Sequence, residues 1–144
     1  MLDSARIAAL IPHAGAMSLL ERVIAWDAAS IRCAAVSHRE TGNPLARDGV
    51  LSALCAIEYA AQAMAVHGGL CASHAARPLA GYLASLRDVV CHMPRVDRTE
   101  HELIVNATQL MRDEARIIYE FSVSLGDVAV VSGRATVVLD VEMR

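Results

Sequence analysis

The sequence contains no lysine, and all 13 of its basic residues are arginines. Without an amine side chain, the protein cannot form a Schiff base or use the lysine of a phosphate-binding loop. The formal net charge is −3, and the arginines form no cluster. Because phosphate binding needs a clustered basic surface, these features argue against a nucleic-acid partner.

Long apolar runs and paired cysteines are also missing. The most hydrophobic segment runs from Leu51 to Val66 with Glu58 at its centre, whereas a membrane-spanning helix needs about 20 apolar residues. The N-terminus lacks the features of a secretory signal, so we expect a cytoplasmic protein. The four cysteines form no Cys-x-x-Cys pair, and we expect them to be reduced and buried.

Metal and serine-hydrolase chemistry have little support. Cys71, His74, Cys91 and His92 could supply four metal ligands, but their spacing fits no zinc motif. No Gly-x-Ser-x-Gly motif is present. We therefore expect a protein that needs no metal, nucleotide or other cofactor.

The residues that are present predict one α+β domain over residues 1–144, which is long enough to bury a core. We expect a short helix at 4–11, a loop at 38–49, and a long helix at 51–67 that ends at Gly68-Gly69. The expected strands are 19–26, 30–37, 81–92, 102–112, 115–125 and 128–141. Period-two alternation over 115–125 and short turns on both sides predict an antiparallel meander of the last three strands.

Glu58 is the residue that this pattern explains least well. The long helix is apolar and alanine-rich on all sides, which predicts burial on all sides. A buried, charged and unpaired carboxylate would cost several kcal/mol. Glu58 therefore either serves chemistry or faces a solvent gap or an arginine. Gln62 lies four residues later on the same face, whereas His67 lies on the opposite face and is expected to cap the helix C-terminus.

Two motifs resemble a known family. The stretch IPHAGAMSLLERV, residues 11–23, is similar to the "LPHRYPFLLVDRV" opening of the 3-hydroxyacyl-acyl-carrier-protein dehydratases. The stretch IEYAAQA, residues 57–63, resembles their central-helix motif "IEAMAQA". Both are closer still to the variant dehydratases of aryl-polyene gene clusters. Motif order, spacing and the following strands agree over almost the whole chain.

The resemblance implies the hotdog fold, in which a six-stranded antiparallel sheet wraps one long helix and two subunits pair. It implies dehydration of 3-hydroxyacyl thioesters, carried by an acyl-carrier protein, to trans-2-enoyl thioesters in fatty-acid or polyene synthesis. Glu58 would protonate the departing hydroxyl. The N–H groups of Ala53 and Leu54 would stabilise the carbonyl oxygen. From its place on the same helix face as Glu58, Gln62 could position the substrate or orient the carboxylate.

One departure concerns the catalytic base. The family places a histidine fourteen residues before the acid, where this sequence has Pro44. His13 and His38 are the candidate substitutes. A homodimer could therefore be active alone, or the chain could be a non-catalytic partner in a heterodimer with another hotdog dehydratase that supplies the histidine. A hotdog thioesterase, with Glu58 activating water, is the third alternative. Arginines that could meet a carrier protein are Arg77, Arg87, Arg95 and Arg98.

Overall fold

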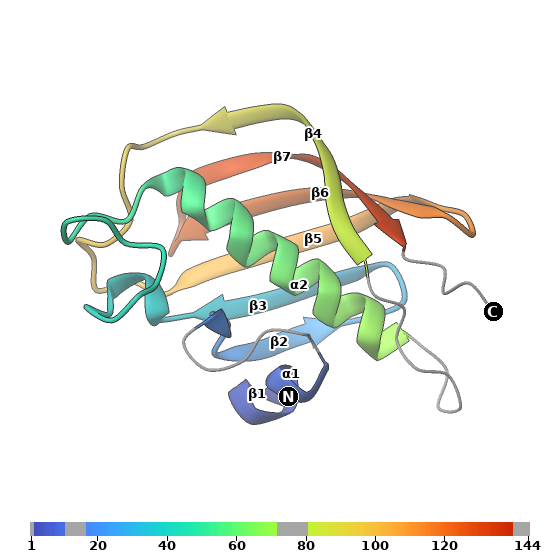
Figure 1. The fold of residues 1–144 in the computed structure, drawn as a ribbon, viewed down its shortest axis with the longest axis horizontal. Coiled ribbons are helices and arrows are strands. Elements are labelled where there is room, and N and C mark those ends of the chain that lie inside the picture. The colour runs from blue at the N-terminus through green and yellow to red at the C-terminus, as the bar shows by residue number, and fades with distance from the viewer. Residues whose placement is uncertain (1, 11–16, 72–80, 140–144) are drawn as a thin grey trace.

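An antiparallel sheet curves around one long helix in the computed structural model, which describes residues 2–10, 17–71 and 81–139 (Figure 1). The helices are α1 (Ser4–Leu10) and α2 (Ala56–Cys71), and two 3-10 turns are η2 (Ser37–Arg39) and η3 (Ala53–Cys55). The strands are β1 (Leu2–Asp3), β2 (Arg22–Trp26), β3 (Ser30–Ala35), β4 (Gly81–Cys91), β5 (Leu103–Arg112), β6 (Arg116–Leu125) and β7 (Val128–Leu139).

The strand order across the sheet is β1-β2-β3-β5-β6-β7-β4, and every pairing is antiparallel. The predicted meander β5-β6-β7 is confirmed. Along β6, Ile117, Tyr119 and Phe121 are buried while Arg116 and Glu120 are exposed, as period-two alternation requires. The expected count of six strands is wrong by one, because the two-residue β1 pairs with β2 at the sheet edge.

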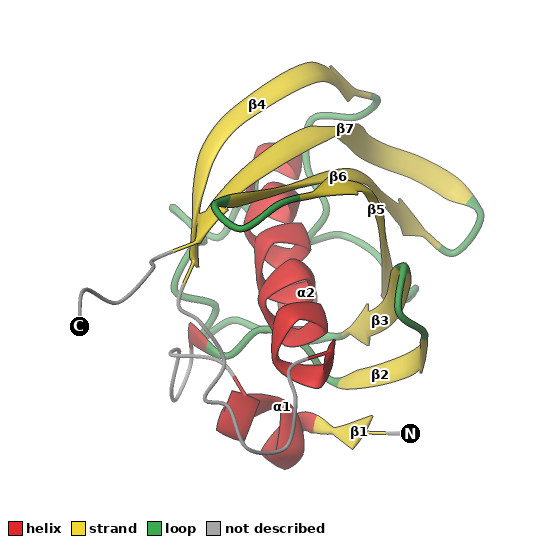
Figure 2. Cartoon of the chain, turned by 90° about the vertical axis from the view of Figure 1, so that its right-hand side faces the viewer, coloured by secondary structure: helices red, strands yellow, loops and turns green. Residues whose placement is uncertain are grey.

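Alanines let α2 approach the sheet closely. Ala56, Ala60 and Ala63 are fully buried. The sheet wraps one side of the helix (Figure 2). The opposite side is not covered in the same way: Leu54, just before the helix, is 55% exposed, and Ala65 is also exposed. The expectation that the helix is buried on all sides is therefore wrong, because the sheet encloses it from one side only.

Helix α2 begins and ends later than the sequence predicts. Residues 51–53 instead run beside residues 94–96, where Val96 N–H donates to the Leu51 carbonyl over 3.0 Å. The carboxylate of Asp97 adds an acceptor for the Leu51 N–H at 2.9 Å. At the other end the two glycines continue the helix to Cys71, and a Cβ on Gly69 would lie 3.3 Å from the Leu10 side chain. Gly69 thus allows α1 to pack closely.

The other expected boundaries agree within a few residues, except where they fall outside the described ranges. Strands β2 and β3 are shorter than predicted, and β7 is described to Leu139. All four cysteines are free, but only Cys33 is fully buried, and burial raises its pKa to about 12. Cys71 and Cys91 are exposed, so the expectation of four buried cysteines is wrong.

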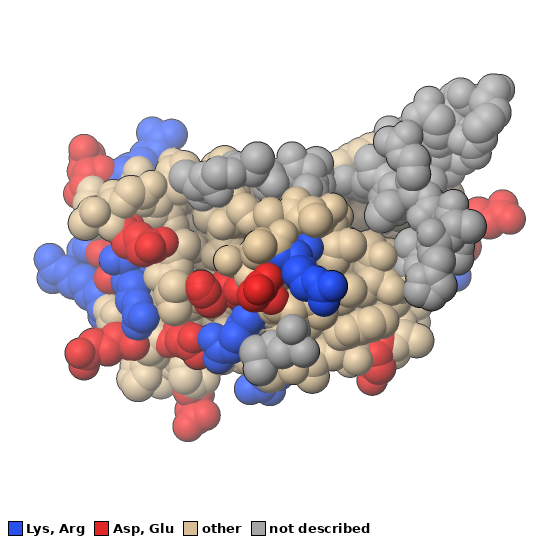
Figure 3. All heavy atoms as spheres, turned by 90° about the horizontal axis from the view of Figure 1, so that it is seen from below, with Lys and Arg blue, Asp and Glu red and all other residues tan. Residues whose placement is uncertain are grey.

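Charges of both signs share the surface. On the face seen in Figure 3, arginines lie beside aspartates and glutamates rather than forming one basic field. The pairs include Arg22 with Glu102 at 2.6 Å and Arg95 with Asp97 at 2.5 Å. Within the described ranges, no helix is long and apolar enough to cross a membrane.

Candidate active site

Glu58 lies in the first turn of α2. Ser52 caps the preceding turn, because its Oγ accepts the Leu54 N–H at 3.2 Å. Glu58 is half-buried and shares a helix side with Leu54, Ala61 and Ala65, the side that the sheet does not wrap. The fold therefore presents this carboxyl at the boundary between the core and an open apolar face.

The N–H groups predicted to stabilise a thioester oxygen already have partners within the chain. The Ala53 N–H donates to the Pro94 carbonyl over 3.1 Å. The Leu54 N–H donates to Ser52 Oγ. A substrate carbonyl would have to displace one of these acceptors, so in this structure neither group is an open donor.

Gln62 is 1% exposed and bonds to the backbone at both ends of its amide. Its Oε1 accepts the Leu19 N–H at 2.9 Å, and its Nε2 donates to the Met17 carbonyl over 2.6 Å. Both partners lie within the first family motif, so these bonds hold residues 17–19 of that motif against α2. A substrate could bind this amide only if that segment moved, so the structure places Gln62 as a scaffold for the segment.

The two candidate histidines are placed differently. His13 lies outside the described residues. His38, in η2, is 1% exposed, and its Nε2 lies 2.9 Å from the His101 carbonyl oxygen. Since a carbonyl only accepts, Nε2 carries the proton, and within the described part of the structure the buried Nδ1 has no hydrogen-bond partner. Neither ring nitrogen of His38 can reach a substrate in this arrangement.

Burial of His38 leads to a prediction about acid stability. Desolvation is the main reason that its pKa is lowered from 6.5. The unfolded chain therefore binds the proton more readily. The contribution of neutral His38 to the free energy of unfolding should be complete above pH 6.5 and should fall as the pH decreases below it. The hydrogen bond to the His101 backbone and the charges of Glu102 and Glu40 raise the pKa, and the charge of Arg39 lowers it; burial outweighs the effects that raise it.

Urea unfolding at pH 7.5 and pH 5.5 would measure this loss. His38→Gln, which keeps a donor for the His101 carbonyl, should lose less stability between the two pH values than the wild type. His92→Gln is the matched control, since His92 is exposed. Equal pH dependence in wild type and His38→Gln would contradict the prediction.

His67 does not cap the end of α2 as expected. Its Nδ1 lies 2.7 Å from the Tyr119 hydroxyl, and its Nε2 lies 2.9 Å from the Asp27 carbonyl oxygen. The ring joins α2 to β6 and to the turn between β2 and β3. The capping prediction is wrong because the helix continues past His67 and the ring points into the core.

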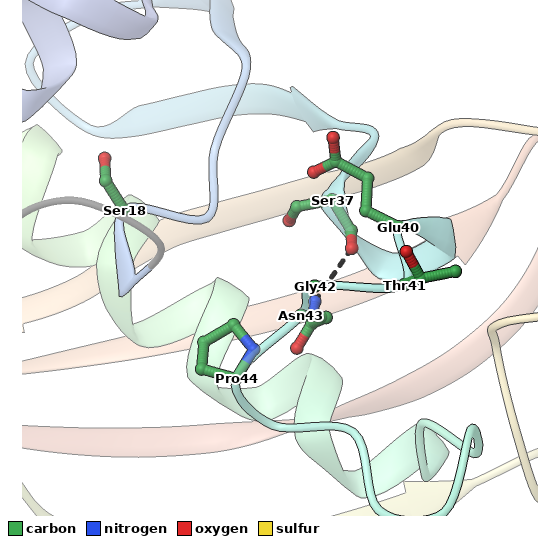
Figure 4. Close-up of a pocket in the computed structure, with 7 residues that line it drawn as sticks. All are labelled: Ser18, Ser37, Glu40, Thr41, Gly42, Asn43 and Pro44. Atoms are coloured by element: carbon green, nitrogen blue, oxygen red, sulfur yellow. Dashed lines mark hydrogen bonds between the residues drawn. The ribbon is translucent and has the colours of Figure 1, made fainter.

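A cavity of about 500 Å³ lies beside the start of α2 (Figure 4). One wall is the loop that holds Pro44, the residue found where the family has its histidine. Ser18 forms the other side, and Ser37 lies next to Glu40 and Asn43, across from Ser18. The full lining is Ser18, Ser37, Glu40, Thr41, Gly42, Asn43 and Pro44.

Sequence reasoning missed the polar network beneath this cavity. The Tyr59 hydroxyl lies 2.8 Å from Ser37 Oγ and accepts from Asn43 Nδ2 at 2.9 Å. Two signals were available: Tyr59 directly follows the candidate acid, and Asn43 directly precedes Pro44. Nothing in the sequence, however, shows that these side chains meet.

The described residues contain no group of three or more possible metal ligands. His74, one member of the considered set, lies outside those residues. Cys71 instead lies 3.4 Å from His67 Nε2, and Cys91 Sγ contacts the Met93 carbonyl at 3.3 Å. The structure thus offers no ligand set in the part that it describes.

Several solved structures are similar to this chain. The dehydratase heterocomplex ApeI:P from Xenorhabdus doucetiae matches at 27% identity and a TM-score of 0.80, over 99% of this chain and 93% of that one. A mutant thioesterase from Pseudomonas aeruginosa matches at 13% identity and a TM-score of 0.61, over 82% of this chain and 79% of that one. A hypothetical thioesterase with coenzyme A from Streptococcus pneumoniae matches at 7% identity and a TM-score of 0.61, over 85% of this chain and 88% of that one.

The thioesterase matches show the hotdog fold alone, and no curated protein matches this sequence. The dehydratase match is stronger in both identity and coverage. A family model described as "ApeP-like: ApeP dehydratase" matches residues 5–143, so the chain belongs to the ApeP-like dehydratase family.

Proposed function

We propose that this chain is the acid-bearing subunit of a heteromeric 3-hydroxyacyl thioester dehydratase. The observation that carries the proposal is the match to a dehydratase family over residues 5–143 in a chain that has Pro44 where the related dehydratases have a histidine. The similar protein from Xenorhabdus doucetiae is a heterocomplex. A second hotdog chain would supply the missing histidine.

In this reaction, a base removes the proton on the carbon next to the thioester carbonyl. The hydroxyl on the following carbon leaves as water when an acid donates a proton to it. Glu58 is the acid in this proposal, since it is half-buried and lies on the open side of α2. A histidine of the partner is the base in this proposal, since this chain has Pro44 at the family's histidine position and His38 is enclosed and bonded to the His101 carbonyl.

The substrate in this proposal is the thioester of an acyl-carrier protein. Such carriers are acidic, and a basic rim near the site would favour docking. Arg47, Arg39 and Arg98 are exposed, and Arg39 lies in η2 beside the cavity loop. Arg95 is engaged by Asp97, so it is less suited to this role than the sequence indicates.

Reconstitution tests the proposal. This chain alone should not hydrate an enoyl thioester of acyl-carrier protein, whereas a mixture with a histidine-bearing hotdog dehydratase should do so well above the rate of that partner alone. Ultraviolet absorbance follows loss of the enoyl thioester, and mass spectrometry distinguishes the hydrated product from free carrier thiol. Activity of this chain alone would refute the heteromer, and release of free thiol would favour the thioesterase alternative.

A further inference from the structure

A directed chain of hydrogen bonds links Ser37 and Asn43, which line the cavity, to Tyr59 in the first turn of α2. Ser37 Oγ lies 2.8 Å from the Leu19 carbonyl oxygen, and because a carbonyl only accepts, Ser37 must donate to it. Ser37 Oγ must then accept from the Tyr59 hydroxyl. The Tyr59 oxygen accepts in turn from the Asn43 amide. Each proton position follows from the one before it.

The Asn43 amide orientation agrees with this direction. Its Oδ1 accepts the Leu45 N–H at 2.8 Å, so its Nδ2 is the end that faces Tyr59 and the Ser37 carbonyl. Burial is the main reason that the pKa of Tyr59 is raised, so the phenol stays neutral and remains a donor. Tyr59 is fully buried and Asn43 is 7% exposed, which shields the bonds from water.

Two separate segments depend on this one hydroxyl. Through Asn43 it holds the loop 40–44, and through Ser37 it holds the Leu19 carbonyl. Gln62, one helical turn after Tyr59, holds the Leu19 N–H. Both backbone groups of Leu19 are therefore hydrogen-bonded. The loop 40–44 and the segment that holds Ser18 and Leu19 lie on opposite sides of the cavity, and these bonds fix both of them to the start of α2.

We propose that Tyr59 is a positioning residue for Glu58: its hydroxyl fixes the two cavity walls against the helical turn from which the carboxyl acts. This rests on the proposed dehydratase function. Glu58 is the sequence neighbour of Tyr59, so a shift of this turn relative to the walls would change where the carboxyl meets the substrate. A displacement of about 1 Å can cost up to about 10²-fold in rate.

The test is Tyr59→Phe in the complex with the histidine-bearing partner. The variant keeps the ring and loses both hydrogen bonds. Tyr119→Phe is a closely matched control, because Tyr119 is equally buried and its hydroxyl bonds to His67 far along the same helix. We expect kcat for enoyl thioester hydration to fall at least about tenfold in Tyr59→Phe with KM little changed, and Tyr119→Phe to keep its kcat.

Asn43→Ala cuts the same chain at its first donor. Since Asn43 and Tyr59 act through one network, the double variant should be no slower than the worse single variant, which is a non-additive result. Thermal unfolding of each variant shows whether lost stability explains the change in rate.

The outcomes separate the two proposals. An active wild-type complex with equal kcat in Tyr59→Phe and Tyr119→Phe would overturn the positioning role and leave the dehydratase proposal standing. Rates that follow melting temperature across all variants would also overturn it. A wild-type complex with no activity would overturn the proposed function and the positioning role together.

Discussion

Replacing Glu58 with Gln is expected to slow hydration of an enoyl thioester by the assembled dehydratase by at least about 10²-fold, the usual scale for a lost general acid. Gln keeps the size of the side chain and its hydrogen-bonding shape, but it has no proton that titrates. Because Glu58 is only half-buried and lies in the first turn of α2, the fold should survive the change.

Two measurements make this result specific to Glu58. Circular dichroism and the melting temperature should show a folded variant that still binds its partner. Glu114→Gln, at the exposed turn between β5 and β6, removes a carboxylate away from the site and should keep full activity. Full activity in Glu58→Gln would refute the proposed role of the carboxyl.

Strands were the most predictable part of this fold. Strand β6 shows the reason. Alternate side chains face the core, so every second residue is apolar: Ile117, Tyr119, Phe121 and Val123. Strand β1 was missed because two residues, Leu2 and Asp3, are too few to show any period. Its pairing with β2 depends on the tertiary position of the N-terminus.

The start of the long helix illustrates a tertiary effect on a local signal. Residues 51–55 are as apolar as the helix that follows, so the pattern alone extends the helix over them. Pairing with residues 94–96 instead holds Ser52 extended, η3 follows at Ala53–Cys55, and α2 begins at Ala56. The same pairing gives the Ala53 N–H a partner, which the resemblance to related dehydratases did not anticipate.

For the site, the sequence identified residues more readily than their contacts. Glu58 could be singled out because burying a charged carboxylate in an apolar helix costs free energy unless the carboxylate is paired or hydrogen-bonded. His38 could not be judged from the sequence, since only the fold shows that its ring is enclosed and bonded to the His101 carbonyl. The chain of bonds from Asn43 through Tyr59 joins residues 16 positions apart, and no periodicity predicts such a meeting.

Subunit pairing gives the other prediction with a large expected effect. Strand β4 lies at one edge of the sheet, where it pairs only with β7 in the described structure. Several of its apolar side chains are exposed to solvent: Tyr82 is 60% exposed, Leu86 is 38% exposed and Val90 is 50% exposed. An open apolar edge strand invites pairing with another chain, so we expect the partner subunit to bind along β4.

The double variant Leu86→Lys/Val90→Lys should therefore dissociate the complex and lower its activity by at least about 10²-fold at micromolar concentration, because two unpaired charges would be buried against the partner. The control, Leu110→Lys/Met111→Lys, adds the same charge on β5 at side chains that are 47% and 39% exposed, and it should remain assembled. Light scattering measures the mass of each mixture. If the β4 variant keeps both mass and activity while the β5 variant loses them, the partner binds elsewhere on the sheet.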